Sequence, residues 1–130
     1  MKRALTVLIV LATLLFAVQQ KRKPRPPEIE ILELNVHRTE ELVTLDGRVK
    51  NIGEMPAERL VVEFDFRDPD NRVVTTKKGP IDEEILDPDQ ESAIQFQTKD
   101  APRFVTVSVR AHAARVGDVK VKNAGPFVIE

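Results

Sequence analysis

The sequence predicts one small all-β domain, built as an antiparallel sandwich, behind an N-terminal hydrophobic helix. Three observations predict it. Apolar residues recur at every second position from Ile29 onward, which is the period of half-buried strands. Turn residues interrupt this alternation at intervals of about 8 to 12 residues. No stretch after Ile29 shows the period of about 3.6 residues that marks an amphipathic helix.

Residues 1–20 have the pattern of a signal peptide or a transmembrane anchor. Two basic residues precede an uninterrupted apolar run from Ala4 to Val18, the order found in secretory signals. Leu15 stands two positions before the small residue Ala17 and breaks the usual cleavage pattern, which favours a retained anchor. The run would reach about 22 Å as a helix, short of a hydrocarbon core of ~30 Å, which favours a cleaved signal. Both outcomes stay open.

Residues 21–27 predict a basic, proline-rich stalk, because their prolines favour extended polyproline II geometry. No acidic residue precedes Glu28, and a basic cluster beside an apolar segment suits an anionic membrane surface. From Glu28 to the end, the chain carries 21 acidic residues and a net negative charge. Phosphate backbones should repel such a domain, so we expect membrane contact through the N-terminal segment and no nucleic-acid partner.

The first strand shows a shift in its apolar phase. Ile29 and Ile31 share one face, whereas Leu32, Leu34 and Val36 share the other. A strand that crosses between two sheets would do this, and so would a strand buried on both faces. The two interpretations are equal at this point.

The remaining strands follow from alternation and turn chemistry. They are expected at 43–50, 60–67, 72–77, 94–96, 105–112 and, as one broken strand, at 119–121 and 127–129. Turns are expected at 51–53, 68–71, 78–80 and 87–89. Seven strands within residues 28–130 predict a single antiparallel sandwich of the immunoglobulin or fibronectin III type, with Phe64 and Val107 between the sheets.

Three stretches resemble a known domain family: Gly47–Gly53, Val62–Asp68, and Leu86–Glu91 followed by Phe96. They are similar to the bacterial FxLYD-type domain and its Ig-like relatives, over roughly residues 28–113. Residues 64–68 lack the Leu-Tyr pair of the family motif, and Asp89 stands where a glycine is usual. The resemblance implies an envelope-exposed β-sandwich and supplies no catalytic or binding residue.

Catalytic chemistry finds little support in the residue types. The chain has no Cys or Tyr, and Ser108 and His112 would lie about 13 Å apart along one strand. Neither His37 nor His112 has a second ligand at metal-binding spacing, and the acidic turns lack the glycine of a calcium loop. We expect no enzyme and no cofactor or metal site. A minor alternative is a hydrolase that uses acidic loop residues such as Asp82 and Glu84, although no apolar neighbour would raise one of their pKa values.

The sequence thus favours a non-enzymatic interaction or structural module of the cell envelope, with a monomeric extracytoplasmic domain. The domain would be membrane-anchored, or secreted to the periplasm after signal cleavage, and its partner would be an envelope protein or polymer. The alternative is an accessory subunit of a membrane complex whose main contact is the N-terminal helix.

We expect a partner to contact an exposed sheet edge, to which it could add a strand, or the end formed by Asp68 to Asn71, rather than a pocket. The segment that follows the turn at 68–71 is the candidate, with Arg72, Val74, Lys77 and Lys78 as its binding residues. Its charges would protect the edge from indiscriminate pairing and could select an acidic strand. A protected edge without a ligand is the alternative.

Overall fold

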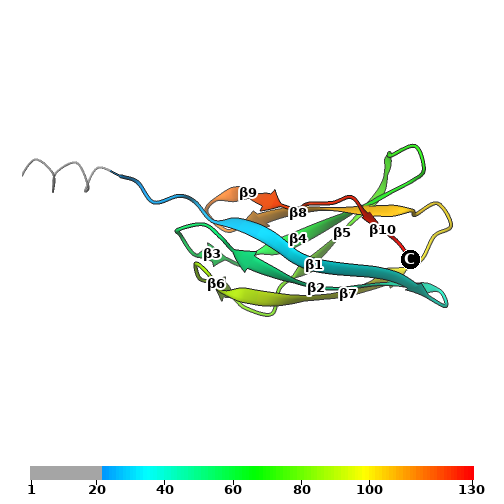
Figure 1. Cartoon of the computed structure of the whole chain (residues 1–130), viewed down its shortest axis with the longest axis horizontal. Coiled ribbons are helices and arrows are strands. Elements are labelled where there is room, and N and C mark those ends of the chain that lie inside the picture. Colours follow the sequence, from blue (N-terminus) through cyan, green and yellow to red (C-terminus); the bar gives the residue numbers. More distant parts are fainter. Residues whose placement is uncertain (1–21) are drawn as a thin grey trace, which may run out of the picture.

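The computed structural model describes residues 22–130, and this part of the chain is all β (Figure 1). Its strands are β1 (Glu28–Thr39), β2 (Leu42–Asn51), β3 (Ala57–Glu58), β4 (Val61–Arg67), β5 (Val73–Pro80), β6 (Ile85–Leu86), β7 (Glu91–Lys99), β8 (Thr106–Ala113), β9 (Gly117–Lys122) and β10 (Phe127–Val128). Eight strands form one sheet in the order β5-β4-β8-β9-β1-β2-β7, with β10 paired to β8. The short strands β3 and β6 form a second sheet.

The large sheet folds into two layers and nearly closes like a barrel (Figure 1). Strands β1, β2 and β7 form one layer, and β5, β4 and β8 form the other. Strand β9 joins them, since it pairs antiparallel with β8 and parallel with β1 at Glu28–Glu30. The predicted all-β class is confirmed, but the described chain has ten strands and one parallel pair rather than seven antiparallel strands. The strands β3, β6 and β10 have two residues each, too few to show an alternation in the sequence. The parallel pair could not be predicted because an alternation does not indicate which strands pair.

The core lies between the layers. Phe64 and Val107 are 1% and 0% exposed, which confirms the prediction that they face inward. Phe64 stacks on Phe96 with ring centroids 5.3 Å apart, and Phe66 stacks on Phe104 at 4.8 Å. A fully buried side chain such as Phe64 or Phe66 contributes about 1.5–3 kcal/mol relative to an exposed one. The other large, fully buried side chains are Ile29, Val43, Leu45, Val49, Leu60, Val62, Leu86 and Val109.

A β-bulge explains the phase shift in β1. The pairing of β1 with β2 is irregular between Ile31 and Glu33, and Leu32 is exposed at this point. The extra residue returns Leu34 to the core, so the bulge rather than burial on both faces accounts for the pattern. A Cβ on Gly47, opposite the bulge, would lie 2.2 Å from the Glu33 carbonyl oxygen, and only glycine fits there.

The turn predicted at 78–80 is wrong, because these residues belong to β5. Gly79 lies opposite Val62 in the ladder, and Pro80 ends the strand, where an edge position tolerates a missing donor. The other three predicted turns and the break between β9 and β10 are confirmed. Asp89 has a φ of 67°, a left-handed backbone conformation that glycine adopts more readily than other residues.

Asn51, the last residue of β2, ties three segments together. Its buried side-chain amide donates to the carbonyls of Met55 and Leu86, both at 2.9 Å. Its carbonyl oxygen accepts the N–H of Gly53 at 3.0 Å. The side chain therefore fixes the turn after β2 and attaches it to the β3–β6 sheet.

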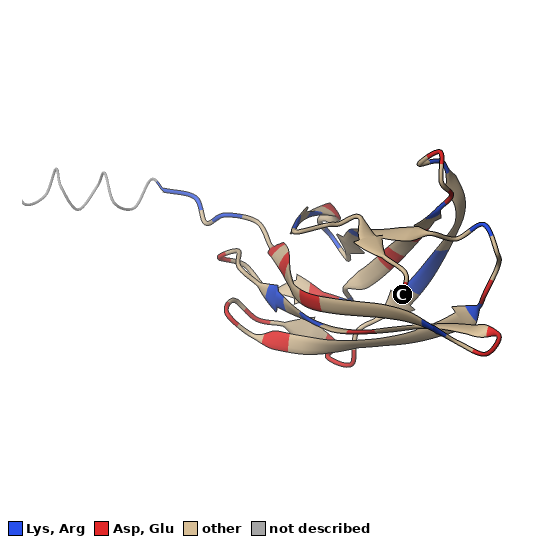
Figure 2. Cartoon of the chain, turned by 45° about the vertical axis from the view of Figure 1, so that its right-hand side comes forward, with Lys and Arg blue, Asp and Glu red and all other residues tan. Residues whose placement is uncertain are grey.

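Residues 22–27, the described part of the predicted stalk, run along the turn after β2 and contact it. Arg25 donates its Nε to Glu54 Oε1 at 2.9 Å, and its carbonyl accepts the Glu54 N–H at 3.2 Å. A Cβ on Gly53 would lie 2.3 Å from the Pro26 carbonyl oxygen. Figure 2 shows this basic segment leading into β1. The predicted helix at 1–20 lies outside the described residues, among which no helix could cross a membrane.

Candidate partner-binding edge

The predicted binding segment lies on an edge strand. Among the described strands, β5 pairs only with β4 and ends the sheet. It carries Val74, Lys77 and Lys78. Arg72 precedes it in the turn, where its N–H donates to Asp68 Oδ1 at 3.0 Å. The four residues that the sequence singled out therefore occupy one edge and the turn that leads into it.

Val74 is the extra residue of a β-bulge. In the ladder, Thr75 lies opposite Phe66 and Val73 lies opposite Arg67, so Val74 between them has no partner. Its side chain packs against the core. Bulges twist an edge away from regular pairing, and this one protects the first part of β5.

The free backbone groups of β5 follow from the alternation of an antiparallel ladder. Val109 donates its N–H to a carbonyl in the loop before β10 (2.8 Å), away from β4. Its partner Phe64 must therefore direct its own backbone groups to β5, where they meet Lys77. The neighbours Thr76 and Lys78 then present their N–H and C=O groups on the open side. Strand addition would use these two residues.

Inward-facing side chains, rather than backbone hydrogen bonds, connect β5 and β7 at the seam between them. The Phe96 ring of β7 comes within 3.4 Å of the position that a Gly79 Cβ would take. Strands β5 and β7 are not paired with each other. Lys77 lies opposite Phe64, so it belongs to the core side of β5, yet it is exposed at this seam. An inward-facing lysine is a device that keeps edges from pairing indiscriminately.

A buried charge network holds β5 to the rest of its layer on the outer face. The Asp65 carboxylate, 4% exposed, accepts hydrogen bonds from Arg110 Nε (2.7 Å), Arg110 Nη2 (2.9 Å) and Thr76 Oγ1 (2.6 Å). Arg110 Nη1 also lies 2.8 Å from Glu63 Oε2, and Lys78 Nζ lies 3.3 Å from Glu63 Oε1. These contacts connect β5, β4 and β8 through side chains.

The network fixes the ionisation of its central pair. The Arg110 guanidinium, and then the Thr76 hydroxyl, hold the pKa of Asp65 below its usual range, although burial opposes this. The hydrogen bonds to Asp65 raise the pKa of Arg110. Sequence reasoning placed these carboxylates at ordinary outward positions and missed the network. The two acids that alternate with Phe64 were the available signal, but the register that sets Arg110 opposite Glu63 cannot be derived from alternation.

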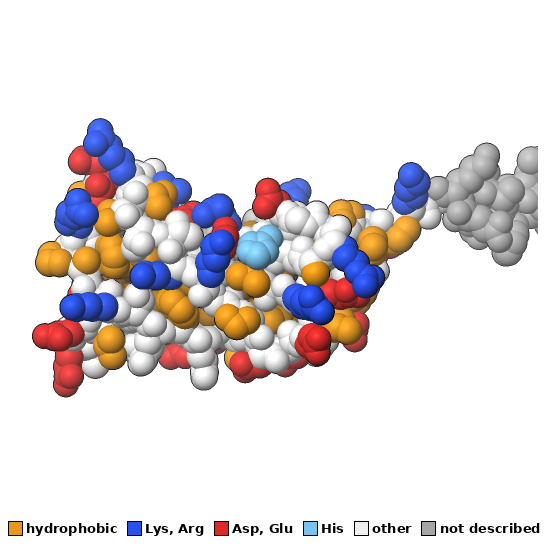
Figure 3. Space-filling view, turned by 180° about the vertical axis from the view of Figure 1, so that it is seen from behind, with side chains coloured by type: hydrophobic (Ala, Val, Ile, Leu, Met, Phe, Trp, Pro, Cys, Tyr) orange, Lys and Arg blue, Asp and Glu red, His pale blue; other side chains and the backbone are white. Residues whose placement is uncertain are grey.

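Basic side chains are in excess on this layer. Strands β4, β5, β8 and β9 hold six Lys and Arg residues and three acidic ones, although residues 28–130 as a whole are net negative. Figure 3 views the molecule from behind and shows Lys and Arg side chains around a histidine in the middle of this face. No described carboxylate forms an ion pair with Arg67, Arg72 or Lys77. Arg72 and Lys77 thus lie at the β5 edge without an ion-pair partner among residues 22–130.

The residues considered for catalysis do not assemble into a reactive group. Ser108 accepts a hydrogen bond from Arg67 Nε at 3.1 Å, and His112 Nε2 lies 3.7 Å from Glu63. Asp82 and Glu84 are exposed to solvent. Within residues 22–130, no three His, Cys, Asp or Glu side chains are grouped to hold a metal ion.

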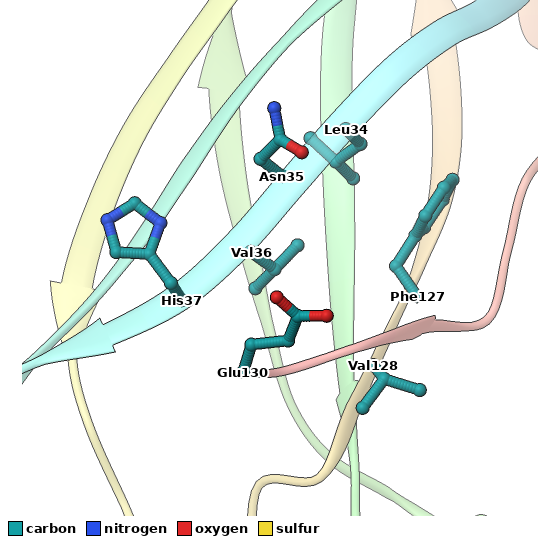
Figure 4. Close-up of a pocket in the computed structure, with 7 residues that line it drawn as sticks. All are labelled: Leu34, Asn35, Val36, His37, Phe127, Val128 and Glu130. Carbon is teal, nitrogen blue, oxygen red and sulfur yellow. The ribbon is translucent and has the colours of Figure 1, made fainter.

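A pocket of about 240 Å³ opens between β1 and the end of the chain (Figure 4). Its lining residues are Leu34, Asn35, Val36, His37, Phe127, Val128 and Glu130. The backbone of Glu130 closes one end, since its N–H donates to Val36 (3.0 Å) and its carbonyl accepts from Arg38 (2.7 Å). In Figure 4 the His37 ring points away from the Glu130 carboxylate. The lining therefore holds no paired acid and base.

Comparisons with known proteins bear on the fold. No protein-family model and no curated protein matches the chain, so the FxLYD resemblance stays a prediction. The structure is similar to IrmA from Escherichia coli, with 13% identity, a TM-score of 0.51, and coverage of 82% of this chain and 98% of IrmA. β-Glucuronidase 2 from Bacteroides uniformis aligns at 19% identity and a TM-score of 0.47, over 73% of this chain and 12% of the enzyme. The ApaA protein from Bordetella pertussis aligns at 14% identity and a TM-score of 0.44, over 68% and 77%. At such identities the likeness to IrmA shows a shared β-rich fold.

Proposed function

We propose that the chain is a non-enzymatic interaction module of the cell envelope, which binds an extended segment of an envelope protein at the free edge of β5. The domain would be an Ig-like or fibronectin III-like module of the FxLYD type, on the outer side of the membrane to which residues 1–20 anchor it. Cleavage of that segment would instead release it to the periplasm. The observation that carries the proposal is the unpaired edge of β5, with the backbone groups of Thr76 and Lys78 on its open side.

The charge network supports this edge as a template. Strand addition gains affinity from main-chain hydrogen bonds, provided that the receiving strand is already ordered. Thr76 and Lys78 each contact a carboxylate of β4 through their side chains, while their backbone groups face outward. The side chains therefore order the strand without occupying the groups that a partner would use.

A proline at Thr76 tests the proposal. Thr76→Pro removes one outward N–H and leaves the ladder with β4 intact, because that N–H does not point to β4. The full chain would be expressed in its membranes, crosslinked, and used to capture envelope proteins. We expect capture to be lost in Thr76→Pro and kept in Thr76→Val, which also lacks the hydroxyl but retains the N–H. Unchanged capture by a folded Thr76→Pro chain would refute strand addition at β5.

The second free edge supplies a matched control. Asn51 donates its N–H to Gln90, on the β7 side of β2. Every second residue of β2 directs its backbone groups to the same side, so the N–H and C=O of Leu45 also point to β7. The backbone groups of Phe96, which lies opposite Leu45, therefore point to β2. The N–H of the next residue, Gln95, points to the open side of β7. Gln95→Pro therefore removes an equivalent donor from the edge of β7 and should leave capture unchanged.

A further inference from the structure

We infer that the segment bound at β5 is acidic, with one apolar residue followed by two carboxylates at the centre of an antiparallel added strand. This inference rests on the proposed function and names the chemistry of the partner at the same edge. Three features of β5 carry it: the sides on which its lysines lie, the lack of an ion pair between Lys77 and any described carboxylate, and the apolar seam at Gly79.

The two lysines face opposite sides of the edge. Lys78 lies opposite Glu63 on the outer face, and Lys77 lies opposite Phe64 on the core side. An added strand places its side chains beside those of β5 with the same alternation. Two consecutive partner residues would therefore meet Lys78 and then Lys77, one on each face.

The charge near the edge is only partly compensated by the described chain. Lys77 forms no ion pair with a described carboxylate, and the same holds for Arg72 at the start of the edge. Lys78 contacts Glu63, but that carboxylate also pairs with Arg110 at 2.8 Å. Two consecutive carboxylates on the partner strand can approach the two lysines, one on each face, without displacing the Arg110 pair. A basic strand would meet repulsion at the same two positions.

The residue that faces Gly79 on the partner should be apolar. Gly79 has no side chain, and the half-buried Phe96 ring lies over it at the seam. A partner side chain at this position would cover the ring and complete the core side of β5. In antiparallel order, the partner positions opposite Gly79, Lys78 and Lys77 read apolar, acidic, acidic.

A synthetic peptide can probe this register. The probe would be a fluorescent peptide with valine, glutamate, glutamate, threonine and valine at its centre, titrated by anisotropy against the full chain in detergent micelles. One control peptide replaces both glutamates by lysines, and another carries N-methyl groups that remove its backbone donors. We expect binding of the acidic peptide, weakened by salt, and binding of neither control at the same concentrations.

Charge reversal at the edge gives the decisive comparison. Lys77→Glu should weaken binding of the acidic peptide by about tenfold, which corresponds to ~1.4 kcal/mol. Lys99→Glu changes the net charge equally on the edge strand β7 and should leave the affinity unchanged. If Lys77→Glu fails to fold, Lys77→Gln serves instead, with a loss of about threefold.

The inference would be overturned by absence of binding, by equal binding of the lysine peptide, or by equal loss in both charge reversals. A dimer of the chain that occupies the edge and excludes the peptide would also overturn it. The inference can fail while the proposed function stands. Capture of an envelope protein that is lost in Thr76→Pro but is not inhibited by the acidic peptide supports strand addition and refutes the acidic partner.

Discussion

Replacement of Arg110 by methionine should destabilise the domain by about 2–3 kcal/mol at neutral pH. The substitution removes two hydrogen bonds to Asp65 and the ion pair to Glu63, both carboxylates being buried. Hydrogen bonds to charged groups contribute about 1.5–3 kcal/mol each, and an unpaired buried charge costs about 3–5 kcal/mol. The Arg110 side chain is itself 59% exposed, so water screens the pair and reduces the loss.

Urea and thermal denaturation of the fragment 22–130 would measure this cost. For a domain of this size, a loss of 2 kcal/mol lowers the melting temperature by about 10 °C. Arg48→Met is the matched control, because Arg48 pairs with exposed carboxylates at 3.5 and 3.2 Å and should contribute less than about 1 kcal/mol.

The pH dependence provides an independent check on the cause. Because the folded-state pKa of Asp65 is lowered, its stabilising contribution is fully present above the unfolded value of about 3.9 and is lost as the pH falls through the folded value. The difference between wild type and Arg110→Met should therefore shrink below about pH 4. A difference under about 0.5 kcal/mol at neutral pH, or one that stays constant to pH 3, would refute the reasoning.

Three further substitutions test the fold. Phe64→Ala should cost about 3–5 kcal/mol in denaturation experiments because it empties a fully buried site, and a cost below about 1 kcal/mol would contradict its place in the core. Asn51→Ala leaves three backbone groups without their partner, two of them buried, and should cost about 2–4 kcal/mol, whereas retained stability would show that water replaces the amide. Gly53→Ala forces the segment at Pro26 away from the domain, so limited proteolysis should cleave before β1 faster than in wild type while the core stays protected; equal cleavage rates would argue against the contact.

Local features of the fold could be predicted from the sequence, whereas pairing could not. Alternation located β2, β4 and β8 to within one or two residues, because apolar and polar side chains alternate along each of them. It misread Gly79 and Pro80 as a turn. Gly79 lies under the Phe96 ring and Pro80 ends an edge strand, and both positions depend on long-range packing. It also placed the phase shift of β1 correctly without finding the bulge at Leu32.

The same distinction applies to the candidate site. An edge position for residues 72–78 followed from the turn before them and from their lysines. The Asp65–Arg110 network required the register of β4 against β8, which joins residues 45 apart in the chain. Which backbone groups face outward required the hydrogen bond from Val109 on the far side of β8. The contacts that define the site are therefore those that no local pattern contains.

The parallel pairing of β1 with β9 has a mechanical consequence. In an anchored chain whose edge strand is held by a partner, tension enters the domain at Glu28 and runs along the axis of β1. At that end β1 is bonded to β9 on one side and to β2 on the other. A pull along the strand loads these ladders in shear, so several hydrogen bonds must break together rather than one after another. Under load, the N-terminal segment before Glu28 would then extend before the domain unfolds, and the edge of β5 would keep its shape.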